Sequence, residues 1–464
     1  MNFTEFLREE WRPALGCTEP ASVAYAAARA AALAPGPVRA VRLRCDARIY
    51  KNCYAVGLPN TGGRTGILWA LAIGCHLPDP ALELECFKST DEGVLEAAKA
   101  LLAAGGVSVQ ADAQLPELHV DCEVAKAGGT GRVVIERRHT RVVRVEKDGA
   151  PMPLGQPAEG TGDGVPLREE LAALSFEELL TLARAISPED RARLREGARL
   201  NVEISRHGLE LFGDRFSRSN RSDSFTQLGQ MVFSGVHARM SGDARVVMTL
   251  AGSGNKGITL AVPLALLSEE LSLDPSRVEE SLALGCLVTS LTTLRLGTLS
   301  AICGCTNAAG IGLAAGLVYV QGGGERELSF AVSNMVGNVT GMICDGAKIG
   351  CALKAMTAVD AAFRAASLAM QGIGIPVSDG IVGADGQESL RNLGRIAAQG
   401  MRGTDEEILS IMQGKLEGRG GSGQERSAER PASAEYGVRS AEDGQRTKDK
   451  GQRQEEQRNR TTDH

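Results

Sequence analysis

A cysteine near the amino terminus has the sequence context of a reactive thiol. Cys17 lies within PALGCTEP (13–20), directly before an alanine-rich stretch at 21–34 that predicts a helix. Thr18 is the expected N-cap and Pro20 falls in the first turn. A thiol at the positive end of a helix dipole has a lowered pKa. We therefore expect a Cys17 thiolate that acts as base or nucleophile; the alternative is a small buried packing residue.

Four cysteines in the carboxyl-terminal half have the types needed for a metal centre. They are Cys303 and Cys305 in CGCTN, and Cys344 and Cys351 in CDGAKIGC. Thiolates select iron-sulfur clusters or zinc, but the spacing fits neither zinc knuckles nor the ferredoxin run. Three ligands from distant segments predict an enclosed site with one metal position left for substrate. The alternative is unrelated core cysteines in glycine- and alanine-rich helices.

Two polar, glycine-containing segments have the character of anion-binding loops. One joins Lys51 and Asn52 to the PNTGG turn, and the other is GSGNKG (252–257), which opens a predicted helix. Exposed backbone N–H groups and a helix N-terminus hold a carboxylate or phosphate. A dinucleotide-binding fold would need a strand before the GSGNKG loop and an acidic residue for the ribose, and the sequence offers no such pair. We therefore favour a carboxylate as the ligand of these loops; the alternative is that they are plain tight turns without a ligand. The expected substrate-binding residues are Lys51, Asn52, Asn60, Thr61, Gly62, Ser253, Gly254 and Asn255.

The histidines do not form a recognisable catalytic or metal-binding pattern. They show no HxxxH or HxH spacing, and the chain contains no Walker sequence, HExxH or GxSxG elbow. We expect most of them to be ordinary surface or core residues. The six are His76, His119, His139, His207, His237 and His464.

The periodicity of the chain predicts an α+β fold. Alternating apolar and polar residues predict strands within 38–54 and 117–145. Helical patterns separated by glycines dominate the carboxyl-terminal half, where no strand-turn-strand pattern occurs. Helices are expected at 21–34, 65–77, 91–104, 175–205, 255–274, 277–292, 296–319, 327–341 and 347–370.

Composition along the chain divides it into five segments. Residues 1–38 form an amino-terminal helical segment with Cys17, and 39–147 a small mixed α/β domain. A Pro- and Gly-rich linker at 148–166 leads to a larger, mainly helical cluster-binding domain at 167–414. Residues 415–464 are highly charged with very few aliphatic residues, so we expect a disordered tail.

The overall composition excludes several classes of protein. The net charge of −6 and the 4% of aromatic residues argue against a nucleic-acid partner. The acidic amino terminus predicts no export signal, and the longest apolar run, 308–320, is too short to cross a membrane. Because no export signal is predicted, we expect a cytoplasmic protein. In that reducing compartment the eleven cysteines, an odd number, are expected to be buried apolar residues, metal ligands or catalytic thiols rather than disulfides. The sequence does not indicate whether the chain forms a homo-oligomer.

Taken together, these motifs resemble the L-cysteine desulfidase family, which is related to the iron-sulfur L-serine dehydratase α chain. The resemblance covers about residues 5–414 in the right order. The most specific motifs are PALGCTEP and GMICDG. The others are the KN and PNTGG segments, ARMSG (238–242), GSGNKGI, LSAIC and the rest of GMICDGAKIGCALK.

The resemblance implies a small amino-acid substrate and a 4Fe-4S cluster held by Cys303, Cys344 and Cys351, with the fourth iron acting as a Lewis acid. Cys305 is the rival of Cys303, which is favoured because the family cysteine follows Leu-Ser-Ala-hydrophobic directly. Cys17 matches the catalytic cysteine of the family. The implied reaction is β-elimination of L-cysteine to pyruvate, ammonia and sulfide without pyridoxal phosphate. L-Serine dehydration and a non-catalytic iron-sulfur sensor are the alternatives.

The chain departs from the family pattern at three places, which leaves substrate choice less determined than cluster binding. His237 replaces a common acidic residue ahead of Ala-Arg-Met, and Leu250 and Ala251 replace polar residues ahead of the GSGN loop. Lys256 stands where a neutral amide is usual. Lys348 and His237 are alternatives to Cys17 as the general base.

Overall fold

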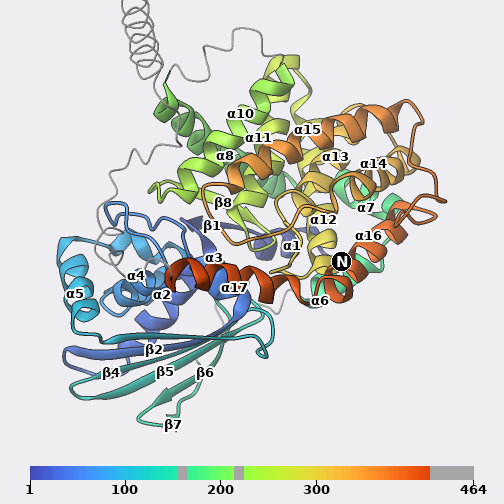
Figure 1. The fold of residues 1–464 in the computed structure, drawn as a ribbon. Helices are drawn as coiled ribbons and strands as arrows, with labels where there is room; N and C mark the ends of the chain where they lie inside the picture. Colours follow the sequence, from blue (N-terminus) through green and yellow to red (C-terminus); the bar gives the residue numbers. More distant parts are fainter. Residues whose placement is uncertain (155–164, 214–223, 418–464) are drawn as a thin grey trace, which may run out of the picture.

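The described part of the protein combines a six-stranded mixed β-sheet and a two-stranded sheet with a large set of helices, which confirms the α+β prediction (Figure 1). The computed structural model describes residues 1–154, 165–213 and 224–417. Among these residues no helix is both long enough and apolar enough to cross a bilayer. The predicted disordered tail lies outside the described residues, except that the last helix, α17 (Thr404–Glu417), runs past residue 414.

Six strands form the larger sheet, in the order β3-β2-β4-β5-β6-β7. Strands β2 and β3 are parallel, and every other neighbouring pair is antiparallel. Burial alternates along β4, so one face of the sheet is packed and the other is partly solvated. The strands are β2 (Val38–Asp46), β3 (Val107–Asp112), β4 (His119–Lys126), β5 (Gly129–Glu136), β6 (Val142–Lys147) and β7 (Ala150–Pro151).

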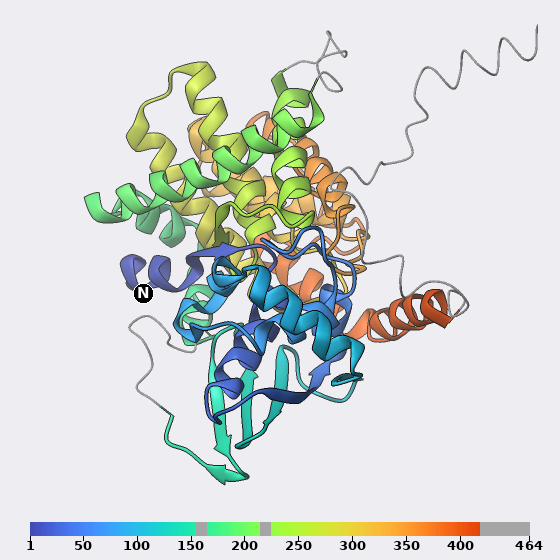
Figure 2. The same ribbon diagram turned by 90° about the vertical axis from the view of Figure 1, so that its left-hand side faces the viewer.

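The alanine-rich helix α2 (Thr18–Ala31) packs on the inner face of this sheet, against β4 and β5. Its small side chains allow close backbone contact: a Cβ on Gly131 of β5 would lie 2.1 Å from the Ala30 carbonyl oxygen. Helices α4 (Ile67–Gly74) and α5 (Glu92–Ala103) and the 3-10 helix η1 (Pro80–Ser89) complete this layer (Figures 1 and 2). One end of α2 is thereby fixed against the sheet, and the other carries Cys17.

The predicted strand at 38–54 is wrong in its second half. Strand β2 ends at Asp46, whose carboxylate accepts hydrogen bonds from the backbone N–H groups of Arg48 and Ile49, at 2.8 and 3.2 Å. This N-cap starts the short helix α3 (Ala47–Cys53). Helix α3 carries the neighbouring residues Lys51 and Asn52, and Lys51 reaches the helical part of the molecule, where its ammonium donates to the carbonyl of Cys344.

The helical part contains α6 (Val165–Ala172), α7 (Phe176–Arg184), α8 (Pro188–Phe212), α10 (Ser224–Met240), α11 (Gly254–Leu271), α12 (Pro275–Leu296), α13 (Ala308–Val320), α14 (Glu325–Val339), α15 (Cys351–Met370), α16 (Gly386–Arg395), the π-helix η2 (Ile396–Gly400) and α17. The predicted helix 175–205 is two helices, because Ser187 caps a new helix whose first residue is Pro188. The helical part has a hydrophobic core of its own, which is separate from the core beneath the sheet.

The predicted helix at 296–319 is also wrong, and this error concerns the site. Helix α12 continues to Leu296 and ends at Gly297, where φ is +93°, a conformation that favours glycine. Helix α13 begins only at Ala308. Cys303 and Cys305 therefore lie on the non-helical connection between these two helices, where backbone N–H and C=O groups are free to pair with another segment.

Two short strands that sequence periodicity does not predict join the amino terminus to the helical part. Strand β1 (Trp11–Leu15) follows α1 (Phe3–Glu10) and pairs antiparallel with β8 (Val246–Leu250), with Trp11 opposite Leu250. Strand β1 leads to Cys17, and β8 leads to the loop that opens α11. The pairing therefore brings the two sequence motifs to the same region of the fold.

A buried ion pair reinforces this junction. Arg168 donates two hydrogen bonds to the Glu10 carboxylate, at 3.0 and 2.9 Å, and Ser290 donates a third at 3.0 Å. Burial disfavours the charged form of Glu10, but these donors outweigh it and hold its pKa below the ordinary value. The pair ties α1 to α6 and α12.

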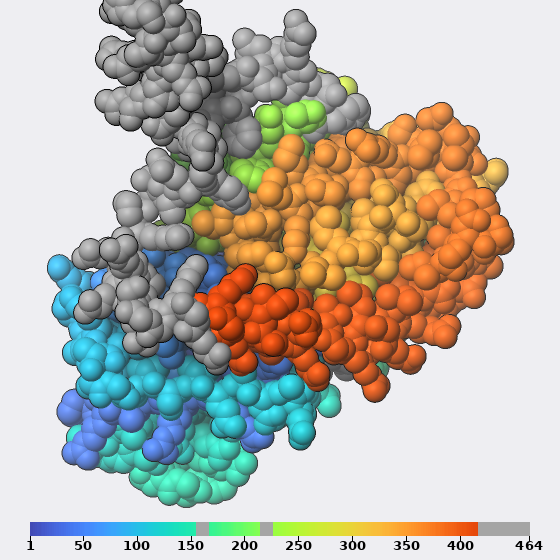
Figure 3. All heavy atoms as spheres, viewed as in Figure 1, coloured from blue at the N-terminus to red at the C-terminus, as the bar shows by residue number. Residues whose placement is uncertain are grey.

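The predicted linker at 148–166 is only partly loop among its described residues. Ala150 and Pro151 pair with β6 as strand β7, and α6 begins at Val165. Residues 155–164 lie outside the described part of the chain. At the other end, helix α17 contacts α3 and lies along the boundary between the sheet and the helical part (Figures 1 and 3).

Candidate active site

Two loops carry three of the four carboxyl-terminal cysteines, and they pair directly with each other. Ile302 and Ile343 form an isolated antiparallel bridge. On either side of it, the N–H of Cys303 donates to the carbonyl of Met342 at 2.8 Å, and the N–H of Cys344 to that of Ala301 at 2.7 Å. Segments 41 residues apart are thus held side by side, with a cysteine at each edge of the bridge.

Cys351 joins this group as the first residue of α15, with its sulfur 3.6 Å from the carbonyl oxygen of Gly346. The charges of Cys303 and Cys344 act on both Cys305 and Cys351, so the four thiols lie within electrostatic range of one another. Interaction with Cys305 and a hydrogen bond from the Thr306 hydroxyl, at 3.5 Å, lower the pKa of Cys303 to about 5, and the interaction with Cys303 raises the pKa of Cys305. Burial raises the pKa of Cys344, and that of Cys351 to about 12.

Lysine ammonium groups surround these thiols. Lys354 donates to the carbonyl of Ile343 at 2.8 Å and pairs with Asp345, and Lys348 pairs with the same carboxylate. Lys51 is 1% exposed; it donates to the carbonyl of Cys344 at 2.7 Å and pairs with Asp405 of α17. Positive charge next to thiols favours their thiolate form, which is the form that binds metal.

Within the described residues, no three His, Cys, Asp or Glu side chains are grouped as ligands of a single metal ion. A four-iron cluster binds each cysteine through a different iron, so its thiolates stand farther apart than the ligands of one ion. Cys303, Cys305 and Cys344 on the paired loops and Cys351 at the start of α15 are soft donors of the type that holds such a cluster, and three of them would leave one iron without a protein ligand. Cys303 and Cys351 are buried, and Cys305 and Cys344 are partly exposed.

Gly346 fixes the position of the loop between Cys344 and Cys351, and a substitution there gives the first prediction. Its φ is +92°, and a Cβ would lie 2.4 Å from the backbone oxygen of Lys51. We expect Gly346→Ala to weaken iron retention by about 10–100-fold, because the ligand loop must move. The measurement is iron retained after a chelator challenge.

The matched control is Gly341→Ala in the same loop region, where an added Cβ meets nothing within 4 Å. Equal iron retention in the two variants, with both folded by circular dichroism, would contradict the role given to Gly346.

A second buried centre surrounds Cys17. The Cys17 thiol donates to Oε2 of Glu19 at 2.9 Å, Thr18 donates to the same oxygen at 3.0 Å, and Asn52 donates to Oε1 at 3.1 Å. Burial opposes ionisation of Glu19, but nearby His139 and the hydrogen bond from Cys17 outweigh it, and the pKa of Glu19 is lowered. The carboxylate is thus a charged hydrogen-bond acceptor in the protein interior.

The expectation of a low pKa at Cys17 is wrong. Burial raises the pKa of Cys17 well above its ordinary value, and the adjacent Glu19 carboxylate raises it further. The residue does lie at the start of α2, but as the N-cap itself rather than before a Thr18 cap, and its side chain makes no capping hydrogen bond. Cys17 is therefore a thiol at rest, with a carboxylate in place to accept its proton.

Several polar atoms around Glu19 are buried with no hydrogen-bond partner among the described residues. They are Oδ1 of Asn52, Nε2 of His139, and Nε and Nη2 of Arg239. His139 is 5% exposed, and its Nε2 lies 4.0 Å from Oε1 of Glu19; burial lowers its pKa. Buried polar atoms of folded proteins nearly always have partners, so this concentration indicates a ligand site.

The two centres are adjacent. On α3, Lys51 contacts the Cys344 loop while its neighbour Asn52 contacts Glu19. Lys256 provides a second connection: its ammonium donates to the carbonyl of Ala251 and to Thr293, and a Cβ on Gly304 would lie 2.9 Å from its Cε. Lys256 acts electrostatically on His139 and is itself affected by Cys305. The thiols and the Cys17 centre therefore face one buried region.

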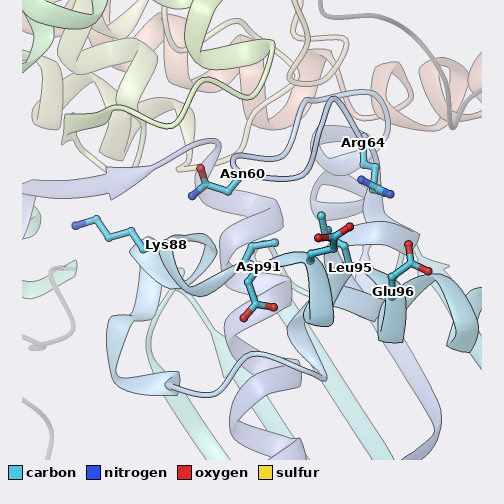
Figure 4. A pocket seen from close by; sticks show the side chains of 8 residues that line it. Asn60, Arg64, Lys88, Asp91, Leu95 and Glu96 are labelled. Atoms are coloured by element: carbon cyan, nitrogen blue, oxygen red, sulfur yellow. The ribbon is translucent and has the colours of Figure 1, made fainter.

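The side chains of Asn60 and Thr61, predicted from the PNTGG turn to bind substrate, make their contacts outside this buried region. Asn60 lines an open surface hollow of about 620 Å³ together with Lys88, Asp91 and Glu96, and its amide donates to the carbonyl of Phe87 (Figure 4). Thr61 is buried, but its hydroxyl donates to the carbonyl of Leu58 within its own turn. These side chains maintain the loop.

The PNTGG loop nevertheless lies beside the Cys17 centre. A Cβ on Gly16 would lie 2.5 Å from the Pro59 ring, and Gly62, with a φ of +65°, completes the turn.

The predicted residues at the start of α11 do reach the buried region. Ser253 is the N-cap, and its side chain makes no capping hydrogen bond. Gly254 is the first helical residue, and Asn255 accepts a hydrogen bond from Nη1 of Arg239 at 2.8 Å. In addition, Thr18 donates to the carbonyl of Gly252 at 3.0 Å, which links this loop to α2.

Sequence reasoning did not assign a role to Glu19, His139 or Arg239. Glu19 stands within the CTEP motif and could have been chosen as the nearest carboxylate to Cys17. His139 is an isolated histidine in a loop between strands, with no pattern to reveal it. Of the two alternative bases, Lys348 is paired with Asp345, and the ring of His237 packs against Phe212.

Comparison with known proteins shows which family the chain belongs to. The family described as "Serine dehydratase alpha chain" matches residues 163–410. The UPF0597 protein GSU1527 of Geobacter sulfurreducens is 34% identical over 418 residues, covering 88% of this chain and 97% of that protein. The chain belongs to the serine dehydratase alpha chain family. The UPF0597 protein TTE0269 of Caldanaerobacter subterraneus subsp. tengcongensis is 33% identical over 414 residues, with coverage of 88% and 97%.

A further member of this set, the UPF0597 protein of Desulfatibacillum aliphaticivorans, is 34% identical over 431 residues and covers 89% of this chain and 98% of its own length. The serine dehydratase alpha chain family is associated with iron-sulfur centres and with lyase chemistry on a small substrate. The resemblance found in the motifs is thereby confirmed at the level of the family.

Proposed function

We propose that this protein is an L-cysteine desulfidase, a carbon-sulfur lyase that eliminates sulfide from L-cysteine without pyridoxal phosphate. The observation that carries the proposal is the adjacency of the cysteine loops and the Cys17–Glu19 pair, joined through Lys51 and Asn52. The cofactor would be a 4Fe-4S cluster held by Cys303, Cys344 and Cys351.

When bound, a cluster with three cysteine ligands supplies one iron with an open position, which acts as a Lewis acid on the leaving group. The protein then needs a base for the proton on Cα and a way to hold the amino acid. Cys17 and Glu19 are buried, so each charge at that centre acts strongly on its neighbours.

Cys17 and Glu19 can remove the α-proton as a unit. The Cys17 sulfur accepts the proton from Cα while its own proton passes to Oε2 of Glu19, 2.9 Å away. The electron pair left on Cα forms the Cα–Cβ double bond, and the Cβ–S bond breaks with its electron pair on sulfide. The aminoacrylate tautomerises and is hydrolysed by water, giving pyruvate and ammonia. The thiol therefore needs no low resting pKa.

The surroundings of Glu19 suit this role. Asn52 holds Oε1 of the carboxylate, which leaves Oε2 directed at Cys17 and Thr18. His139 lies close enough to influence the proton once it has reached the carboxylate. We place the reaction in the cytoplasm, because all eleven cysteines are unpaired and a reducing compartment keeps them so.

L-Serine dehydration is the second candidate, and the description of the matching family favours it. The same residues would remove the α-proton, and hydroxide would leave in place of sulfide. The two reactions differ only in the leaving group. The residues around Glu19 act on the α-proton, so they would serve either substrate and do not indicate which one is used.

Substrate comparison tests the proposal. Full-length protein reconstituted with iron and sulfide under anaerobic conditions is given L-cysteine or L-serine, and pyruvate, ammonia and sulfide are measured. We expect a higher kcat/KM for L-cysteine, with one sulfide for each pyruvate. Faster turnover of L-serine would make the protein a serine dehydratase. A retained cluster without pyruvate from either amino acid would favour an iron-sulfur binding or sensing protein.

A further inference from the structure

The side chain of Arg239, at the end of α10, is one of the most deeply buried charged groups in the described structure. It is 1% exposed, and Nη1 donates to Oδ1 of Asn255 at 2.8 Å. Its Nε and Nη2 atoms are buried without a hydrogen-bond partner among the described residues. These two atoms form one edge of the guanidinium, the edge whose parallel N–H groups match the two oxygens of a carboxylate.

The guanidinium lies against the first turn of α11. A Cβ on Gly254, the first residue of this helix, would lie 2.4 Å from Nε and 2.6 Å from Cζ of Arg239. The Ser253 side chain does not cap the helix. An 18-residue helix has partial positive charge at such an end and unsatisfied N–H groups that favour an anion. Two independent features therefore favour negative charge at one place.

The charge balance of the buried region points the same way. Lys256 is 3% exposed and its hydrogen-bond acceptors, the Ala251 carbonyl and Thr293, are neutral; burial lowers its pKa to about 8. Two carboxylates act on Lys256, and both already have partners: Glu10 accepts from Arg168, and Glu19 accepts from Cys17, Thr18 and Asn52. Arg239 acts electrostatically on both Cys17 and Glu19, so its free edge belongs to their surroundings.

We infer that Arg239 binds the α-carboxylate of the substrate through Nε–H and Nη2–H, with the amino-terminal turn of α11 as the second contact. This inference deepens the proposed function and rests on it for the identity of the amino acid. It restricts the substrates to small amino acids with a free carboxylate, and it assigns Asn255 to holding the guanidinium. An amine without the carboxylate lacks the partner that this buried arginine requires.

Binding without turnover tests the inference. L-Alanine has the amine and carboxylate of L-cysteine but no leaving group, and L-alaninamide replaces the carboxylate with a neutral amide. Calorimetry on the reconstituted wild-type protein should give a dissociation constant about 100-fold lower for L-alanine than for L-alaninamide. Equal binding of the two, or no binding of L-alanine, would overturn the inference with no substitution needed.

Substitution provides the second arm. Arg239→Lys keeps the charge but loses the fork, and we expect it to weaken L-alanine binding by about 100-fold and to raise KM for L-cysteine far more than it lowers kcat. Arg245→Gln is the matched control, because this nearby arginine is exposed and pairs with Asp243. Circular dichroism and thermal unfolding establish that both variants fold.

The two proposals fail differently. Turnover of L-cysteine with an unchanged KM in Arg239→Lys would overturn the carboxylate site and leave the proposed function standing. Arg239-dependent binding of L-alanine without turnover of L-cysteine or L-serine would do the reverse.

Discussion

Replacement of Cys344 by alanine is expected to remove the cluster and with it the turnover of L-cysteine. The same result is expected for Cys303→Ala and Cys351→Ala, since the proposal assigns each of the three thiolates to a different iron and assigns the neighbouring Cys305 to none. Cys303 and Cys344 lie at opposite edges of one backbone bridge, so loss of either removes one side of the site. Iron and labile sulfide after anaerobic reconstitution, and pyruvate formation, are the measurements.

Two other cysteines serve as controls for these variants. Cys286 is buried in the helical core on α12, away from the paired loops, and Cys286→Ala should keep both iron and activity. Cys305→Ala should also keep iron, because the proposal assigns the ligand position to Cys303. Loss of iron in Cys305→Ala together with retention in Cys303→Ala would reverse that assignment. Full iron content in all three ligand variants would refute the thiolate site.

Cys17→Ala is expected to keep the cluster and lose catalysis. Removing a positioned acid-base group lowers turnover by about 10²–10⁴-fold. Because the thiol and Glu19 act as a unit, Glu19→Gln should cause a loss of the same order, and the double variant should be little worse than either single one. The measurements are kcat for L-cysteine and iron per chain in the same preparations.

Cys53→Ala is the matched control, since Cys53 is fully buried beside the same centre and has no part in the proton transfer. It should retain most of the wild-type kcat. A Cys17→Ala variant with wild-type kcat and an intact cluster would exclude Cys17 and Glu19 as the base. His139 would then be the next residue to test as the base.

Much of the architecture follows from local patterns. The alternation along 117–145 predicted strands where β4, β5 and β6 lie, and the alanine content of 21–34 predicted the helix that packs on them, α2. Boundaries failed where a single residue changed the structure: Asp46 caps a helix inside a predicted strand, and Gly297 ends α12 before the cysteine loop. Strands β1 and β8 were missed because each is short and finds its partner more than 200 residues away.

The sequence indicated which residue types could form the site, but it did not indicate how burial and neighbouring charges set their pKa values. The softness of the cysteines predicted an enclosed shared centre, with unrelated core cysteines as the alternative, and the loops that carry Cys303 and Cys344 do pair. The dipole argument for Cys17 failed because burial and the Glu19 carboxylate outweigh the effect of a helix end. Arg239 and His139 come from segments far apart in sequence, so their unpartnered atoms become visible only in the folded chain.

Iron and acid-labile sulfide in anaerobically reconstituted wild-type protein test the central claim most directly. The account predicts about four of each per chain, in a cluster whose visible or magnetic spectrum changes when L-cysteine is added, since one iron lacks a protein ligand. Protein that binds no iron under these conditions, or binds a single zinc instead, would contradict it.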